Sequence, residues 1–168
     1  MTTAQTELFT VSPAPAKQAW PANQFKPLWI GERLPAEETT SPEASAAYWF
    51  RNVALMPLFD PDKEHLVALM LNTKMRCFAW NLISVGTLNE SAAHPREIIR
   101  PAIAASAWGF VLVHNHPSGD TSPSHADHSV TRRIREASEL LQIRLVDHII
   151  VGRASTDKAF SFLAAGML

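Results

Sequence analysis

An apolar run that ends in paired histidines constrains this chain more than any other stretch of its sequence. Residues 110–113 read Phe-Val-Leu-Val, and His114, Asn115, His116 and Pro117 follow directly. The run has the length and bulk of a buried strand. In an extended chain, residues i and i+2 point to the same side, and the proline steers His116 away from helical conformation. Two imidazoles at one strand end are a natural pair of ligands for a divalent metal ion, although such a pair on its own favours histidines without metal.

The chain after the histidines offers a third ligand, Asp127. Residues 117–123 are rich in Pro, Ser, Gly and Asp, which are typical of turns. Ser124 followed by Asp127 is a helix-capping arrangement, so we expect a helix over residues 124–141 that carries Asp127 in its first turn. Two histidines and one carboxylate leave a tetrahedral metal with an open position, as in catalytic zinc sites. The single cysteine cannot supply the thiolates of a closed structural site.

The spacing of His-x-His, seven residues, Ser, two residues and Asp resembles the JAMM signature of the MPN metallopeptidase domains. The fuller string around it, with residues 86–89, 94–97 and 147–150, is similar to the RadC branch of that family. The resemblance covers roughly residues 60–168. It implies an α/β fold of the MPN, cytidine-deaminase-like kind, with a mixed sheet flanked by helices. It also implies a zinc-dependent peptidase or isopeptidase in which metal-bound water attacks an amide bond of a peptide or protein substrate.

Hydrolysis at such a site needs a group that takes a proton from water and delivers it to the leaving amine. The resemblance gives this role to a glutamate at the start of an upstream strand, and Glu64, just before the apolar run of residues 66–71, matches that position. Glu97 is the competitor, although its place in the first turn of a helix explains it without catalysis. The resemblance gives Ser124 the role of stabilising the oxyanion, and helix capping is its structural alternative.

We favour structural roles for the other polar residues near the motif. His125 and His128 match no ligand position and are expected to face solvent, and His148 is expected to be a hydrogen-bonded strand residue. Asp120 is expected to shape the loop, with a bond to a ligand histidine as the less favoured alternative. His94 is expected to cap or pack at a helix start. A pair of histidines without metal is the alternative to the ligand assignment, and the filled signature positions argue against it.

We divide the chain into a Pro-rich N-terminal arm, residues 1–40, and a single domain, residues 41–168. The arm is expected to be extended. Its apolar residues, such as Trp20 and Trp29, favour docking on the domain or on a second copy as a homodimer, with ordering by crystal contacts alone as the alternative. Pro101 is expected to kink its helix, with the alternative that it falls early enough in the helix to be tolerated. The periodicity predicts helices over residues 42–54, from 95 onward and over 124–141, and strands over 66–71, 75–85, 110–113, 145–151 and 159–163.

Composition narrows the function classes. The net charge is −1, from 15 basic and 16 acidic residues, which argues against a strong electrostatic grip on nucleic acid. The single cysteine, Cys77, fits a reducing compartment and is expected to be a packed thiol rather than a nucleophile. No secretory signal and no apolar segment of transmembrane length is apparent, so we expect a cytoplasmic protein without a membrane partner.

A second function class stays open, namely a RadC-like metal-binding module associated with DNA repair or mobile elements and without peptidase activity. Fuller RadC-like proteins carry an N-terminal helix-hairpin-helix segment typical of DNA contact, which the Pro-rich arm does not resemble. A third reading, an MPN scaffold that binds partners without metal, is disfavoured because every signature position is filled.

Overall fold

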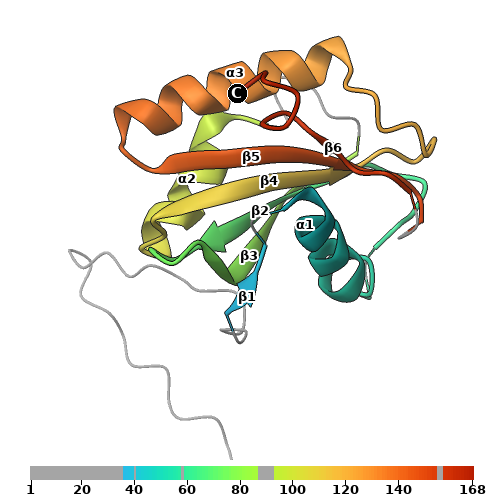
Figure 1. Cartoon of the computed structure of the whole chain (residues 1–168), viewed down its shortest axis with the longest axis horizontal. Coiled ribbons are helices and arrows are strands. Elements are labelled where there is room, and N and C mark those ends of the chain that lie inside the picture. The colour runs from blue at the N-terminus through green and yellow to red at the C-terminus, as the bar shows by residue number, and fades with distance from the viewer. Residues whose placement is uncertain (1–35, 40, 58, 87–92, 155–156) are drawn as a thin grey trace, which may run out of the picture.

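The computed structural model describes residues 36–39, 41–57, 59–86, 93–154 and 157–168. These residues form one six-stranded sheet in the order β1-β3-β2-β4-β5-β6, with helices packed on it (Figure 1). The strands are β1 (Glu37–Glu38), β2 (His65–Leu71), β3 (Arg76–Val85), β4 (Gly109–Asn115), β5 (Arg144–Val151) and β6 (Phe160–Ser161). The helices are α1 (Pro42–Tyr48), its π-helical continuation η1 (Trp49–Val53), α2 (Pro95–Ala104) and α3 (His125–Leu140). The predicted mixed α/β sheet flanked by helices is confirmed.

Helices cover both faces of the sheet, and this explains why its central strands are apolar throughout. Every residue of β2 and β4 is buried. On one face their side chains pack with Ile98 of α2 and Ile134 of α3. On the other face they pack with Trp49 and Val53 of η1. A strand buried on both faces does not alternate between polar and apolar residues, so an uninterrupted apolar run is what such a strand requires.

The strand register brings three strand ends together at one end of the sheet. His114, near the end of β4, pairs with Leu66 at the start of antiparallel β2 and with Ile150 near the end of parallel β5. A parallel pair needs a crossover connection, and α3 provides it between β4 and β5 (Figure 1). The first turn of α3 therefore begins near the carboxyl ends of both strands, where the polar motif lies.

Most element boundaries match the prediction, and the differences lie in the helix predicted over residues 42–54, in β1, which was not predicted, and in β6. Ser41 caps α1 as expected, with its side chain accepting a backbone N–H bond. The single helix predicted over residues 42–54 is instead α1 followed by η1, where Ala54 N–H bonds to Trp49 C=O five residues earlier. This wider turn leaves both Trp49 and Val53 fully buried. α2 continues past Pro101 to its last residue, and β6 has two residues where five were predicted.

The end of the predicted arm joins the sheet. Residues 1–35, which include Trp20 and Trp29, lie outside the described residues. Glu37 of β1 pairs with Cys77 of β3, so β1 forms one edge of the sheet. Burial raises the pKa of the Cys77 thiol to about 11, and the prediction of a packed thiol is confirmed. Among the described residues, no helix has the length and apolar character needed to cross a bilayer.

Candidate metal centre

His114 and His116 meet at the end of β4, as the period of a strand predicts. Their Nε2 atoms are 3.0 Å apart. Asp127, from the first turn of α3, approaches both, with Oδ1 3.1 Å from His114 Nε2 and Oδ2 3.5 Å from His116 Nε2. One ligand atom from each of the three residues lies within 4.8 Å of the others, so this group is able to hold a metal ion. The three residues that the sequence predicted as ligands lie together in the structure.

A capping box holds the Asp127 carboxylate in place. Ser124 Oγ accepts a hydrogen bond from Asp127 N–H at 3.2 Å, and Asp127 Oδ2 accepts one from Ser124 N–H at 2.7 Å. Ser124 Oγ also lies 2.6 Å from Asp127 Oδ2, so the hydroxyl hydrogen points at the carboxylate. Ser124 is therefore the cap of α3 and at the same time a hydrogen-bond donor to the predicted metal ligand.

The hydrogen bonds of His116 leave its Nε2 available to a cation. His116 Nδ1 lies 2.6 Å from the backbone carbonyl of Asp120, which only accepts hydrogen bonds, so Nδ1 carries a hydrogen and Nε2 faces Asp127. A lone pair opposite a carboxylate needs a positive charge between them, either a proton or a metal ion. The hydrogen bond to Asp127 accordingly raises the pKa of His116, against the opposing effect of burial. Two nitrogens and one carboxylate oxygen also form a donor set that zinc accepts.

Asp127 stays ionised although it is only 1% exposed. Burial alone would raise the pKa of this carboxyl group. Hydrogen bonds from His114 and His116, together with the charge of His114, outweigh that effect and hold the pKa of Asp127 well below its usual range. The cluster is thus built around a negative charge that is ready to pair with a cation.

Glu64 precedes β2 and lies beside the cluster. Leu66 pairs with His114, and continuing this antiparallel register two residues further sets Glu64 opposite His116. The charge of Glu64 is also among the smaller influences that raise the pKa of His116. Asn115, between the two ligands, holds both neighbours of Glu64: its Oδ1 accepts from His65 N–H at 2.8 Å, and its Nδ2 donates to Lys63 C=O at 3.0 Å.

Glu97, the competing acid, faces a different environment. Its carboxylate pairs with Arg96 at 3.0 Å and with Arg100 at 3.3 Å on the surface of α2. The hydrogen bond from Arg96 lowers the pKa of Glu97. These contacts give Glu97 a structural explanation, whereas the strand register sets Glu64 beside the cluster.

Of the remaining polar residues near the motif, Asp120 and His148 contact the predicted ligands. The Asp120 side chain shapes the loop by accepting from Ser122 N–H at 2.9 Å, while its backbone carbonyl accepts from His116. His125 and His128 are exposed. His148 is fully buried and lies 2.9 Å from His114, and burial lowers its pKa well below the usual value. The side chain of His94 caps α2.

The sequence analysis missed two residues that support the cluster, Asn115 and Thr131. The available signal for Asn115 was an amide side chain at the end of an otherwise apolar buried run. For Thr131 it was a position four residues after Asp127, which places both on the same face of a helix. Neither signal identifies the distant partners, which are His65 and Lys63 for Asn115 and His148 for Thr131, because these come from other parts of the chain.

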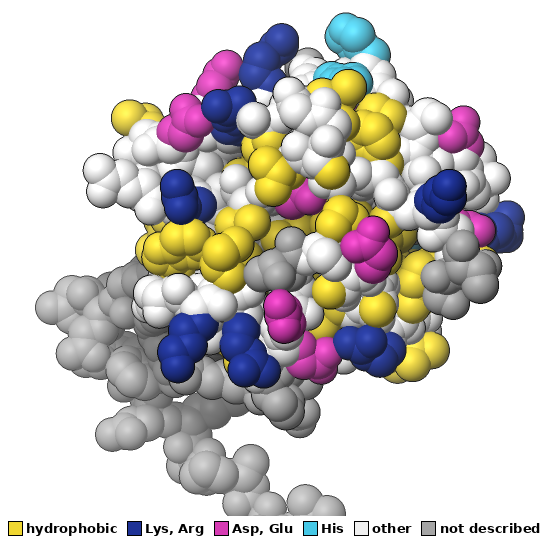
Figure 2. Space-filling view, in the orientation of Figure 1, with side chains coloured by type: hydrophobic (Ala, Val, Ile, Leu, Met, Phe, Trp, Pro, Cys, Tyr) yellow, Lys and Arg dark blue, Asp and Glu magenta, His cyan; other side chains and the backbone are white. Residues whose placement is uncertain are grey.

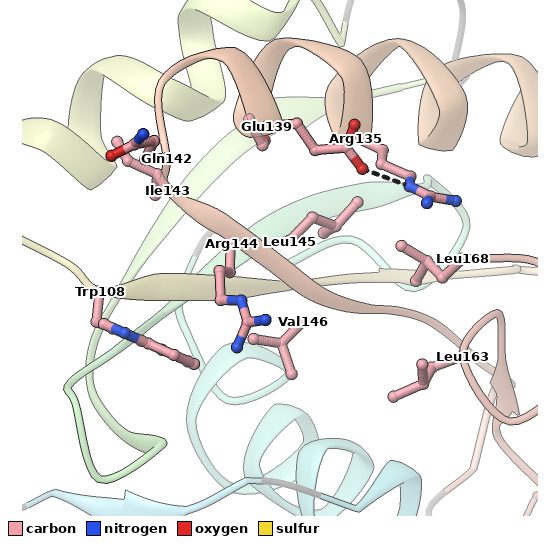
Figure 3. Close-up of a pocket in the computed structure, with 11 residues that line it drawn as sticks. Trp108, Arg135, Glu139, Gln142, Ile143, Arg144, Leu145, Val146, Leu163 and Leu168 are labelled. Carbon is pink, nitrogen blue, oxygen red and sulfur yellow. Dashed lines mark hydrogen bonds and ion pairs between the residues drawn. The ribbon is translucent and has the colours of Figure 1, made fainter.

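A hollow of about 530 Å³ lies elsewhere, along the first half of β5 (Figure 3). Trp108, Arg144, Val146 and Leu163 line it, and the ion pair between Arg135 and Glu139 of α3 borders it. It shares no lining residue with the His-His-Asp cluster. The hollow is therefore separate from the metal centre, and the chemistry of the site is argued from the cluster.

Comparisons with known proteins agree with the motif. A family model described as the RadC-like JAB domain matches residues 39–167. A UPF0758 protein of Pelodictyon phaeoclathratiforme is 50% identical over 109 residues, which cover 65% of this chain and 48% of that protein. A UPF0758 protein of Geobacter sulfurreducens is 47% identical over 110 residues, which cover 65% of this chain and 46% of that protein. The chain thus spans about half the length of the curated relatives it matches.

Proposed function

The chain belongs to the RadC-like JAB domain family, and on that premise we propose that it is a zinc-dependent hydrolase of the JAMM type that cleaves a peptide or isopeptide bond. The observation that carries the proposal is the largely buried His-His-Asp cluster with Glu64 beside it at the same end of the sheet. An open metal position next to a carboxylate that can act as acid/base is the arrangement that amide hydrolysis requires. The proposed ligands are His114, His116 and Asp127, and the proposed metal is Zn²⁺.

Each residue has a defined part in this reaction. Zinc bound at the cluster would lower the pKa of water to about 7 and polarise the substrate carbonyl. Glu64 takes the proton from the attacking water as the new C–O bond forms. It then delivers this proton to the amide nitrogen, so that the C–N bond breaks and a neutral amine leaves. Ser124 donates a hydrogen bond to the oxygen on which negative charge develops.

The role of Ser124 requires one hydrogen to change its partner. Its hydroxyl hydrogen points at Asp127 Oδ2, at 2.6 Å. A metal ion held by Asp127 would draw electron density away from this carboxylate and would weaken its attraction for the hydroxyl. The Ser124 hydrogen is then able to turn toward the substrate, while Ser124 Oγ still accepts the capping bond from Asp127 N–H.

Charge favours a protein or peptide substrate over nucleic acid. The net charge of the chain is −1. On the face drawn in Figure 2, Lys and Arg side chains are interspersed with Asp and Glu instead of gathering in one basic patch. A DNA-repair module would need a basic surface to neutralise phosphates, and its DNA affinity would fall steeply with salt. Retention on DNA that weakens in this way would support that alternative function.

The test combines metal analysis with a substrate screen. Purified protein is loaded with Zn²⁺ and screened against peptide and isopeptide libraries, with Glu64→Gln as the control that keeps the shape of the side chain. We expect cleavage by the wild-type chain and loss of cleavage in Glu64→Gln with zinc still bound. Full zinc content in His116→Ala and Asp127→Ala, measured by elemental analysis, would show that the ligand assignment is wrong. Cleavage unaffected by Glu64→Gln would remove Glu64 from the mechanism.

A further inference from the structure

A chain of buried hydrogen bonds connects the first proposed ligand to the third. His114 Nδ1 lies 2.9 Å from His148 Nε2. The other nitrogen of that ring, His148 Nδ1, lies 2.6 Å from Thr131 Oγ1. Thr131 Oγ1 in turn lies 2.6 Å from the backbone carbonyl of Asp127. His114 and His148 are both fully buried and Thr131 is 3% exposed, so water does not compete for these bonds.

The backbone carbonyl of Asp127 fixes the direction of every bond in this chain. A carbonyl only accepts, so the single hydroxyl hydrogen of Thr131 belongs to the 2.6 Å contact with it. Thr131 Oγ1 then has only lone pairs for His148, and His148 Nδ1 must carry the hydrogen of that contact. A neutral His148 then has a bare Nε2, which accepts the hydrogen on His114 Nδ1. His114 Nε2 is then the nitrogen that faces Asp127, where a metal ion would take the place of a proton.

We propose that His148 is a positioning residue that accepts the Nδ1 hydrogen of His114 and so presents His114 Nε2 to the metal. The direction of its bonds is set by Thr131 and the Asp127 carbonyl. The inference rests on the metal-binding part of the proposed function and does not depend on peptidase activity. Ligand histidines commonly give their second nitrogen to such a partner, which fixes the tautomer and orients the ring. Here the partner is a neutral imidazole instead of a carboxylate, so it adds no negative charge to the site.

The C-terminal segment holds the His148 ring in position. The ring stacks on Phe162, with centroids 4.9 Å apart and planes within 9° of parallel. Asp147 connects β5 to β6 and to the residues that follow it. Its Oδ1 accepts hydrogen bonds from His148 N–H and Leu163 N–H, and its Oδ2 accepts one from Ser161 Oγ–H at 2.6 Å. With Phe162 on one face and a hydrogen-bond partner at each nitrogen, His148 has no nitrogen left to bind a metal itself.

The first arm of the experiment reads the tautomer in metal-free protein by long-range ¹H–¹⁵N NMR. We expect His148 to be neutral, with its hydrogen on Nδ1 and a bare Nε2. A hydrogen on His148 Nε2 would reverse the chain and overturn the inference. Thr131→Ser, which keeps the hydroxyl, should preserve the wild-type tautomer, whereas Thr131→Val, of similar shape, should allow the other tautomer to appear.

The second arm measures zinc affinity by competition with a chelator. His148→Leu removes the acceptor and should weaken zinc binding by about 10–100-fold, while His148→Gln, which keeps an acceptor, should recover most of that loss. His128→Leu is the matched control, because the exposed His128 ring contacts Phe162 from outside the chain of bonds and should not change the affinity. Wild-type zinc affinity in His148→Leu would overturn this inference and leave the proposed function unaffected. Failure of the wild-type chain to bind zinc would instead refute the proposed function.

If His148→Leu does not fold, as judged by circular dichroism of the metal-free protein, the Thr131 pair decides the matter. Thr131→Val should then bind zinc more weakly than Thr131→Ser at equal thermal stability. Equal affinities in these two variants would contradict a role for the chain of bonds in presenting His114.

Discussion

Replacing Asn115 by alanine should both destabilise the protein and release Glu64 from the cluster. The Asn115 side chain holds the residues on each side of Glu64, at 2.8 Å to His65 N–H and 3.0 Å to Lys63 C=O. Since His65 is fully buried, its N–H would be left without a partner, at a cost of about 1–3 kcal/mol. Lys63 is exposed, so water replaces the second bond, and we add only about 0.5 kcal/mol for it. The free energy of unfolding should therefore fall by about 1.5–3.5 kcal/mol.

Two measurements on metal-free protein test this expectation. Urea denaturation gives the change in unfolding free energy, and NMR titration gives the pKa of His116. The charge of Glu64 contributes to the raised pKa of His116, behind the larger effect of the Asp127 hydrogen bond. Glu64→Gln should lower that pKa, and Asn115→Ala should lower it by a smaller amount because Glu64 becomes free to move away.

Asn72→Ala serves as the control for loss of stability alone. Asn72 Oδ1 accepts from Lys74 N–H at 2.9 Å and Arg76 N–H at 3.1 Å in the exposed turn between β2 and β3, far along the strand from the cluster. It should destabilise the protein without changing the pKa of His116. A His116 titration in Asn115→Ala identical to wild type, alongside a clear shift in Glu64→Gln, would refute the idea that Asn115 positions Glu64. A loss of stability below about 0.5 kcal/mol would refute the hydrogen-bond argument.

Three further predictions concern the metal ion and the cap. Zinc at 100 times its Kd should raise the unfolding free energy by about 2.7 kcal/mol, seen as a higher Tm, and Asp127→Asn should abolish most of this rise. The raised pKa of His116 means that its contribution to metal-free stability is complete below about pH 6.5 and is lost as pH rises through the folded-state value. Since zinc competes with that proton, zinc affinity should increase between pH 6 and pH 8 in chelator titrations, and a flat profile would contradict the assignment. Ser124→Ala should cost about 1 kcal/mol from the lost cap, measured in urea, and an unchanged stability would mean that the capping bond contributes nothing.

Local rules, together with the resemblance, were sufficient to predict that His114, His116 and Asp127 lie together. The two-residue period of a strand brought His114 and His116 together, and the capping pattern of Ser124 set Asp127 in the first turn of α3. Both rules act over a few residues, so they can be recognised from the sequence alone. The fold class followed from the same periodicities and from the resemblance.

The supporting contacts could not be predicted because they join distant parts of the chain. His65 and Asn115 are 50 residues apart, and His114 and His148 are 34 residues apart. Their meeting depends on the strand order and on the register, which periodicity within one segment does not specify. His148 was expected to be a hydrogen-bonded strand residue, but the identity of its partners required the pairing of β4 with β5. The π-helical turn at Trp49 likewise reflects packing on the sheet instead of a local signal.

The stacking of His148 on Phe162 has a consequence for how the protein matures. A ribosome makes the polypeptide from its N-terminus, so all three proposed ligands are synthesised before Phe162, on which His148 stacks. The parallel pairing of β4 with β5 also joins segments far apart along the chain, and such pairings form slowly. If the cluster holds the proposed ion, a nascent chain should bind it weakly and should bind it tightly only after the segment that follows β5 has docked.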